Sequence, residues 1–327
     1  MEVPDYELPE TAVAQVPAEP RDSARLLDAI SEPPRHLRVR DLPALLDEGD
    51  VVVLNTSRVV PARLRLRKQT GGAAEVLLIE PLGDEVWEAM VRPGSRLAPG
   101  TVLYKGGLPV VEVGERLVSG NRAVKSLVAD PCAYGELALP PYIHRPLEDP
   151  ERYQTVYSAR PGSVAAPTAG LHLTKAVLDE CRERGAVVVP VDLAVGPGTF
   201  KPVKAARAED HEMHPERYVV PRQTWEACYE AKQQGRRVWA VGTTSVRALE
   251  AAAATGSLEG RTDLYIRPGH RFAVVDVLMT NFHQPRSTLL LLLEAFAGPR
   301  WRQLYAVALE EGYRFLSFGD AMVVGRA

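Results

Sequence analysis

The sequence predicts an α/β domain with a largely parallel sheet, and an all-β, barrel-like domain inserted into its first half. After residue 150, apolar strand patterns alternate with helical patterns, as parallel strands with helical crossovers require. Between residues 62 and 150 only short strand patterns occur, separated by glycine and proline turns. The length of 327 residues also exceeds the usual size of one domain.

Residues 1–61 are assigned to the α/β domain. Helical patterns are expected around residues 23–30 and 41–48. The wholly apolar run at 51–54 predicts a buried strand, and the polar sequence N-T-S-R follows it. The chain is then expected to enter the inserted domain.

Residues 62–150 are expected to form a small barrel or sandwich. Pairs such as Gly-Gly, Pro-Gly and Gly-Asn mark the turns between short strands. The six candidate strands lie at 64–67, 75–79, 86–91, 102–104, 110–113 and 123–127.

Residues 151–327 return to the α/β domain. Helices are expected at 176–184 and 225–234, and each precedes an apolar strand, at 187–191 and 238–241. A leucine-rich helix follows Ser287 or Thr288, and either hydroxyl can cap it.

Five segments in this region are poor core material but suit a ligand site. They combine glycines, which allow close approach to the main chain, with histidines, hydroxyls and carboxylates. Because they fall at the ends of buried elements, we expect them to form one site. The segments are 152–174 with Thr168, Gly170 and His172, 191–203 with Gly196 and Gly198, 210–216 with His211 and His214, 240–250 with Thr243, Thr244 and Ser245, and 278–294 with Asn281 and His283.

Together with L-P-P-Y-I at 139–143 and Y-R-F-L-S-F-G-D-A-M at 313–322, these segments resemble the S-adenosylmethionine:tRNA ribosyltransferase-isomerases of queuosine biosynthesis. The resemblance runs over nearly the whole chain, starting at D-Y-E-L-P-E (5–10). The sequence departs from the family pattern at a few positions. One is Ala194, where the family is expected to have histidine, so a histidine there is not required for the chemistry.

The resemblance implies a tRNA-modifying enzyme. Such an enzyme transfers the ribosyl portion of S-adenosylmethionine to the aminomethyl group of 7-aminomethyl-7-deazaguanine at the tRNA wobble position. It releases adenine and methionine and leaves an epoxycyclopentanediol. S-adenosylmethionine is then a cosubstrate, no true cofactor is expected, and tRNA is the partner.

The familiar nucleotide-binding signatures do not occur. The sequence has neither a G-x-G-x-x-G motif after a strand nor a Walker phosphate loop. S-adenosylmethionine is therefore expected to bind at the polar turns, above all where a strand ends and a helix begins near Gly242. The expected ligand-binding residues are Thr168, Gly170, Gly196, Gly198, Thr243, Thr244, Ser245 and Asn281.

The chemistry calls for a base, because the sulfonium makes the adjacent ribose carbon acidic. A histidine, or a carboxylate in apolar surroundings, suits this role. The sequence does not decide which group is the base, and Glu212 remains a further carboxylate. The expected catalytic residues are His172, His211, His214, His283 and Asp320.

Two other functions remain open at this point. His211, His214 and Glu216 fit a metal-assisted hydrolase, but their spacing is not H-E-x-x-H, and no metal is expected. A noncatalytic RNA- or nucleotide-binding module is disfavoured, because five polar turns with histidines exceed what holding a phosphate requires.

Binding of RNA must rely on a local patch, because the formal net charge is −3. Arg58 precedes a strand pattern in which Arg63, Arg65 and Arg67 alternate with apolar residues and so share one face. This row is expected to contact phosphates, with a solvated strand face as the alternative. Further basic candidates are Lys201, Lys204, Arg207, Arg236, Arg237, Arg267 and Arg271. An aromatic residue among Tyr153, Tyr157, Phe200 and Phe282 is expected to stack on an unstacked anticodon base, unless these residues belong to the core.

The three cysteines lie far apart and form no C-x-x-C pair, so neither a disulfide framework nor a zinc site is indicated. No apolar run approaches the length of a membrane span, and no secretory signal is recognised. We expect a cytoplasmic protein without membrane contact.

Overall fold

The computed structural model describes residues 2–196, 198 and 207–327. The chain divides into two compact units, which are treated separately below. An α/β unit contains residues 1–58, 140–160 and 166–327. A barrel unit contains residues 59–139 and 161–165, whereas the sequence predicted the boundaries at 61/62 and 150/151.

The α/β unit is built on a nine-stranded sheet in the order β15-β13-β12-β3-β14-β16-β17-β1-β2. The strands are β1 (Arg25–Asp28), β2 (Arg35–Arg38), β3 (Val51–Asn55), β12 (Val187–Leu193), β13 (Glu216–Val219), β14 (Val238–Val241), β15 (Glu259–Thr262), β16 (Val277–Asn281) and β17 (Ala321–Gly325).

The prediction of a largely parallel sheet is not confirmed, because the sheet is mixed. The four central strands β12, β3, β14 and β16 run parallel, and β1 is parallel to β17. The pairs β16·β17, β1·β2, β12·β13 and β13·β15 are antiparallel. The sequence predicted the apolar strands β3, β12 and β14 but not β16. Strands β1, β2, β13 and β15 carry charged residues that gave no strand signal.

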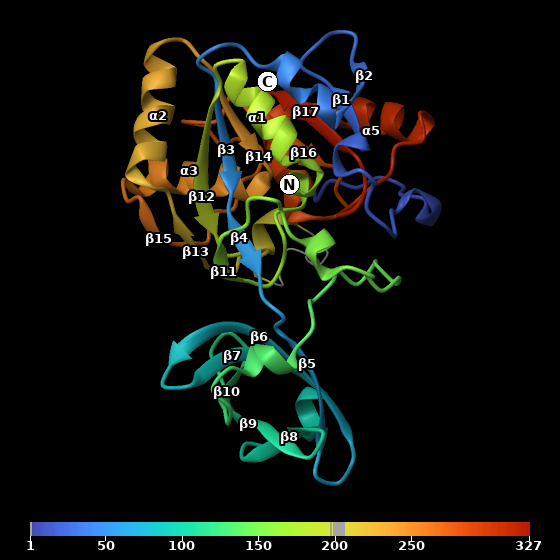
Figure 1. The fold of residues 1–327 in the computed structure, drawn as a ribbon, viewed down its shortest axis with the longest axis vertical. Coiled ribbons are helices and arrows are strands. Elements are labelled where there is room, and N and C mark those ends of the chain that lie inside the picture. The colour runs from blue at the N-terminus through green and yellow to red at the C-terminus, as the bar shows by residue number, and fades with distance from the viewer. Residues whose placement is uncertain (1, 197, 199–206) are drawn as a thin grey trace. The chain divides into compact units, whose positions relative to one another are not determined.

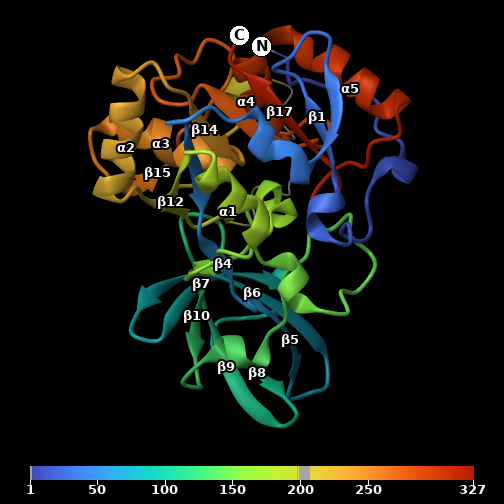
Figure 2. The same ribbon diagram turned by 45° about the horizontal axis from the view of Figure 1, so that its top comes forward.

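Helices cover both faces of this sheet (Figures 1 and 2). Helix α1 packs Val177 and Cys181 against one face, where they join a buried cluster with Val52 and Trp239. Helices α2 and α3 contact strands β12, β3 and β14, and Figure 1 places them on the opposite face. The helices are α1 (Lys175–Glu183), α2 (Arg222–Gln233), α3 (Thr243–Thr255), α4 (Thr288–Ala297) and α5 (Trp301–Glu310).

Two helix caps follow the sequence closely. The hydroxyl of Thr174 accepts the amide of Val177 at the start of α1. Ser287, rather than Thr288, caps α4 by accepting the amide of Leu290.

The helix expected at 23–30 is wrong, because this segment forms strand β1. Leu26 pairs with Ala321 of β17 and with Leu37 of β2, and these tertiary contacts override the local helical pattern. The helix expected at 41–48 appears as a 3₁₀ helix at Val39–Leu45, which contains Pro43.

The barrel unit is closed and antiparallel, with the strand order β10-β7-β6-β5-β8-β9. All six predicted strands are confirmed. Strand β5 shows why: Leu64 and Leu66 are buried in the barrel core while the residues between them face outward. The strands are β5 (Arg63–Lys68), β6 (Ala73–Gly83), β7 (Val86–Arg92), β8 (Thr101–Lys105), β9 (Leu108–Arg116) and β10 (Arg122–Ser126).

A separate two-stranded sheet pairs β4 (Ser57–Val59) with β11 (Arg160–Ser163). Within the described part of the chain, none of the helices combines the length and apolar character needed to cross a membrane.

Candidate functional site

The polar turns predicted from the sequence follow the central parallel strands of the α/β unit. Strand β12 leads to Gly196, β14 to Gly242, and β16 ends at Asn281. Because these strands are parallel, their carboxyl ends meet at one edge of the sheet, hereafter the carboxyl edge. Open α/β sheets generally bind their ligands at this edge.

Asn281 is the centre of a hydrogen-bond network at the carboxyl edge. Its Oδ1 accepts the hydroxyl of Thr168 at 2.8 Å, and its Nδ2 lies 2.9 Å from Nε2 of His172. The same Nδ2 donates to the main-chain carbonyl of Asp320 at 3.3 Å. The segment Thr168–His172, a 3₁₀ helix, is thereby attached to the end of β16. Three of the predicted residues thus lie in direct contact.

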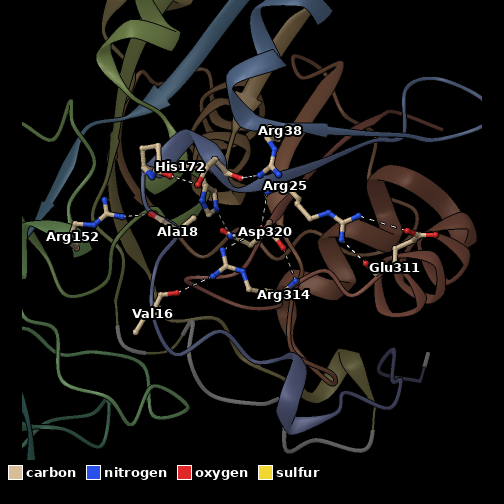
Figure 3. A network of polar contacts seen from close by, with 12 residues as sticks. Val16, Ala18, Arg25, Arg38, Arg152, His172, Glu311, Arg314 and Asp320 are labelled. Carbon is tan, nitrogen blue, oxygen red and sulfur yellow. Dashed lines mark hydrogen bonds and ion pairs between the residues drawn. The ribbon is translucent and has the colours of Figure 1, made fainter.

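His172 is buried and is held in its neutral form. The pKa of His172 is lowered to about 4, chiefly by burial; the charge of Asp320 opposes this shift, and the positive charges of Arg314, Arg21 and Arg152 add to it. Figure 3 shows His172 close to Asp320 and Arg314. At neutral pH this imidazole is uncharged.

The carboxylate of Asp320 is engaged by the main chain. Its Oδ1 accepts the amide of Arg25 at 2.9 Å, and its Oδ2 accepts the amide of Arg314 at 2.8 Å (Figure 3). The guanidinium of Arg314 lies 3.4 Å from Oδ1. These contacts connect β1 to the loop before β17. The Asp320 side chain therefore stabilises the conformation of that loop.

His283 follows the end of β16 by two residues and is buried in the protein interior. Its Nε2 is 3.0 Å from the hydroxyl of Thr280, and its main-chain amide donates to Tyr305 at 2.8 Å. The hydroxyl of Tyr6 donates to its carbonyl at 2.5 Å. Burial lowers the pKa of His283 to about 3. This histidine fixes the turn that follows Asn281.

The turn between β14 and α3 presents free donors. Gly242 has φ of 86°, which favours glycine, and α3 begins at Thr243 without a side-chain cap. The hydroxyl of Ser245 donates to Val241, whereas the buried hydroxyl of Thr244 has no hydrogen-bond partner in the structure. A Cβ on Gly242 would lie 3.7 Å from Ala169, so this turn adjoins the Thr168–His172 segment.

Gly170 makes room for a tyrosine. A Cβ at Gly170 would lie 1.9 Å from the hydroxyl of Tyr157 and 3.1 Å from Thr155. The hydroxyls of Tyr157 and Thr155 are buried and have no partner in the structure. Burial raises the pKa of Tyr157, which therefore remains a neutral donor. The sequence pointed to Gly170 but gave no signal for the phenol that requires it.

The turn after β12 is held by an ion pair. Glu216 accepts the amide of Gly196 at 2.8 Å through Oε1 and pairs with Arg247 of α3 through Oε2. A Cβ on Gly198 would lie 3.3 Å from the ring of His214. Because Arg247 lies one helical turn after Thr243, this turn is linked to the start of α3.

His211 and His214 lie in the loop before β13. His214 is exposed, whereas His211 packs edge-on against Tyr265 with ring centroids 5.7 Å apart. Burial, followed by the proximity of His214, lowers the pKa of His211. No group of three or more potential metal-ligating side chains was found among the described residues. Glu216, the proposed third ligand of the hydrolase alternative, is occupied by Arg247 and Gly196.

Two further polar side chains at the carboxyl edge were not singled out from the sequence. Asp192, near the end of β12, is 3% exposed, and neither of its carboxylate oxygens has a hydrogen bond. Arg217 and Arg160 approach it only at 3.6 and 3.9 Å. The hydroxyl of Ser57, two residues after β3, is also buried without a partner. The sequence cannot show that the side chains of Asp192 and Ser57 lack hydrogen-bond partners, because these partners depend on the tertiary structure.

The candidate RNA-binding arginines already have partners. In the α/β unit, Arg58 donates to Ser158 at 3.0 Å and pairs with Glu151. In the barrel unit, Arg63 pairs with Glu75 at 3.0 Å, Arg65 pairs with Glu136 at 2.6 Å, and Arg67 donates to the carbonyl of Gly71 at 3.0 Å. Arg65 is nevertheless 68% exposed. Phe200, Lys201 and Lys204 lie outside the described residues.

Comparisons with known proteins agree along the whole chain. A family model described as queuosine biosynthesis protein matches residues 2–324. An S-adenosylmethionine:tRNA ribosyltransferase-isomerase of Thermus thermophilus is 49% identical over 99% of both chains. One of Natranaerobius thermophilus is 46% identical over 98% of both. The crystal structure of the S-adenosylmethionine tRNA ribosyltransferase of Thermotoga maritima is similar with a TM-score of 0.56, at 34% identity over 98% of both chains.

Proposed function

Because the chain belongs to the family of queuosine biosynthesis proteins, we propose that it is an S-adenosylmethionine:tRNA ribosyltransferase-isomerase. It transfers the ribosyl portion of S-adenosylmethionine to the aminomethyl group of 7-aminomethyl-7-deazaguanine at the wobble position of tRNA. Isomerisation of the ribose gives epoxyqueuosine, and adenine and methionine are released. S-adenosylmethionine is consumed as a cosubstrate, and tRNA is the second substrate.

One observation supports placing the chemistry in the α/β unit. The carboxyl edge gathers the network of Thr168, Asn281 and His172 beside the uncapped start of α3. Buried polar groups without partners surround it, and such groups gain hydrogen bonds when a polar ligand binds. The proposed ligand-binding residues are Thr168, Gly170, Gly196, Gly198, Thr243, Thr244, Ser245 and Asn281.

The start of α3 suits the methionine portion of S-adenosylmethionine. Its free amides, together with the positive end of the helix dipole, favour the carboxylate of that portion. The hydroxyl of Thr244 supplies a further hydrogen bond there. The nucleoside is proposed to lie against the turns that contain Gly170, Gly196 and Gly198, whose own spaces are lined by Tyr157, Glu216 and His214.

Among the expected catalytic residues, His172 is the one that acts on the ribosyl portion, because it lies within the Asn281 network. His283 and Asp320 position this network through their own contacts with Thr280, Tyr305 and the main chain. His211 and His214 belong to the loop beside the Gly198 turn and line the site there.

In the barrel unit, the row of Arg63, Arg65 and Arg67 contacts tRNA phosphates. Arg63 and Arg65 exchange their glutamate partners for phosphate, and Arg67 exchanges the carbonyl of Gly71. Arg58 of the α/β unit serves in the same way. The compact units, with boundaries at 58/59, 139/140, 160/161 and 165/166, support the proposed division into an α/β domain and an inserted all-β domain. The free cysteines suit a reducing cytoplasm.

The reaction is tested by incubating the protein with S-adenosylmethionine and tRNA that carries 7-aminomethyl-7-deazaguanine, in the presence of a chelator. We expect equimolar release of adenine and methionine, and a tRNA nucleoside whose mass corresponds to epoxyqueuosine. The same tRNA with guanine at the wobble position is the matched control and should give neither product.

Activity that is lost with the chelator and restored by zinc would contradict this proposal and favour the metal-assisted hydrolase. Binding of the tRNA without release of adenine would instead favour a noncatalytic module.

A further inference from the structure

The hydrogen bonds around Asn281 determine which nitrogen of His172 carries the proton. The main-chain carbonyl of Asp320 can only accept a hydrogen bond, so the amide atom that faces it at 3.3 Å must be the nitrogen Nδ2. The oxygen Oδ1 then faces Thr168, whose hydroxyl donates at 2.8 Å. The orientation of the Asn281 amide is therefore set by two partners other than the histidine.

The second hydrogen of Asn281 Nδ2 points to Nε2 of His172 at 2.9 Å. Because Asn281 donates, Nε2 must accept, and the neutral ring must carry its proton on Nδ1. A proton added at Nε2 would meet the N–H of Asn281 and would break the bond. The lone pair that a general base needs is thus already occupied.

From this network we propose that His172 acts as a neutral hydrogen-bond donor, through Nδ1–H, to an oxygen of the ribosyl portion of the substrate, and that Thr168 and Asn281 are positioning residues that fix this tautomer. The inference rests on the proposed function for the identity of the acceptor. The tautomer itself depends only on the contacts of this chain.

The free side of the ring supports this role. No hydrogen-bond partner of Nδ1 occurs among the described residues, although the ring is only 4% exposed. The charged groups that face the ring are Asp320, Arg314, Arg21 and Arg152, and the three arginines disfavour protonation. A neutral donor can stabilise negative charge that develops on a substrate oxygen without giving up its proton.

Nuclear magnetic resonance of ¹⁵N-labelled protein tests the tautomer directly. The chain has seven histidines, so His172→Gln identifies the signals of this ring by their absence. We expect the pattern of a neutral ring protonated at Nδ1 between pH 5.5 and 8, since the pKa of His172 lies at about 4. A ring protonated at Nε2, or charged in this range, would overturn the proposal, whether or not the protein releases adenine.

The variant Asn281→Asp reverses the polarity of the contact at nearly constant shape. A carboxylate accepts from Nε2, so the proton should move to that nitrogen and the pKa of His172 should rise by about 1–3 units. Thr168→Val is the second variant, in case the aspartate prevents folding. It removes one of the two contacts that orient the amide and leaves the one to Asp320, so a minor Nε2–H tautomer should appear beside the Nδ1–H tautomer. An unchanged Nδ1–H tautomer in both variants would contradict the positioning roles.

Two substitutions of His172 separate a donor from a base in activity assays. In His172→Asn the amide nitrogen can replace Nδ1–H, whereas in His172→Gln the amide reaches the position of Nε2. We expect kcat to fall about 100-fold in the glutamine variant, as when a catalytic donor is removed, but about 10-fold in the asparagine variant. KM for S-adenosylmethionine should change little in either. Equal and nearly complete loss of kcat in both variants would show that the ring is a base and would overturn the proposal.

Discussion

The two units differ in whether their polar side chains have hydrogen-bond partners. In the barrel unit, Arg63 and Arg65 of β5 pair with glutamates, Arg67 donates to the carbonyl of Gly71, and the core is apolar. In the α/β unit, Asp192, Thr244 and Tyr157 are buried with oxygens that have no hydrogen bond. Every such unsatisfied side chain found among the described residues belongs to the α/β unit. Unsatisfied groups cost stability unless a ligand or water pairs with them, so their concentration in the α/β unit supports the proposal that the ligand binds there.

The largest expected effect that tests this contrast is a loss of stability in mild acid. The pKa values of His172 and His283 are lowered to about 4 and about 3, whereas an unfolded histidine has a pKa of about 6.5. The unfolded state therefore binds more protons below pH 6.5. The free energy of unfolding should fall by about 1.4 kcal/mol per pH unit for each histidine as the pH drops from about 6.5 toward 4, and the full contribution is present above pH 6.5.

Urea unfolding at pH 7 and pH 5, followed by spectroscopic signals of the α/β unit, measures the dependence of the free energy of unfolding on pH. The variants His172→Gln and His283→Gln should each reduce it, whereas His144→Gln, at an exposed position, is the control and should not. An identical slope in all three variants would mean that the buried rings titrate normally.

The next largest effect is expected at Gly170. The substitution Gly170→Ala places a methyl group 1.9 Å from the hydroxyl of Tyr157, and such overpacking should lower the free energy of unfolding by about 1–3 kcal/mol. The second substitution Tyr157→Phe removes the clashing oxygen and should recover part of this loss. Gly325→Ala, where nothing lies within 4 Å of the new methyl, is the matched control. Strictly additive effects of the two substitutions would contradict the contact.

A smaller effect separates binding from stability at the start of α3. Thr244→Val removes a buried hydroxyl that has no partner, so the free energy of unfolding should stay constant or rise. KM for S-adenosylmethionine should nevertheless increase about tenfold, which corresponds to one hydrogen bond of about 1.4 kcal/mol. Ser245→Ala should instead lower the free energy of unfolding, because that hydroxyl donates to Val241. Unchanged KM in Thr244→Val would remove this residue from the site.

The smallest effect on stability is expected in the barrel unit. Replacing Arg63, Arg65 and Arg67 with alanine removes surface contacts that contribute at most about 1 kcal/mol each. Affinity for tRNA should fall, and the dependence of log Kd on log salt should flatten by about 2. Turnover at saturating tRNA should remain nearly constant. Lys125→Ala, at the exposed position of β10, is the control. Unaltered tRNA affinity in the triple variant would show that the arginines of β5 form only a solvated face.

The two units also differ in how much of their structure can be predicted from the sequence. The barrel strands are recognisable because apolar residues such as Leu64 and Leu66 alternate with charged ones. Every strand of a closed barrel has one side toward the core and one toward solvent, so this two-residue period is expected in each of them. The mixed order of the large sheet is not recognisable, because Leu26 becomes a strand residue only through its pairing with Ala321. At the site, Thr168, His172 and Asn281 stand out by composition. Tyr157 does not, because a tyrosine without a partner looks like any other tyrosine in sequence.

The place of β17 in the large sheet has a consequence for how the chain folds during synthesis. Leu26 pairs with Ala321, and nearly the whole sequence lies between these partners. Strands β1 and β2 therefore have no place in the sheet until the last strand has left the ribosome. The barrel strands lie within residues 63–126 and can pair as soon as this segment emerges. We expect the barrel to be the first part to become resistant to protease on the ribosome, and the large sheet to be completed only after β17 has emerged.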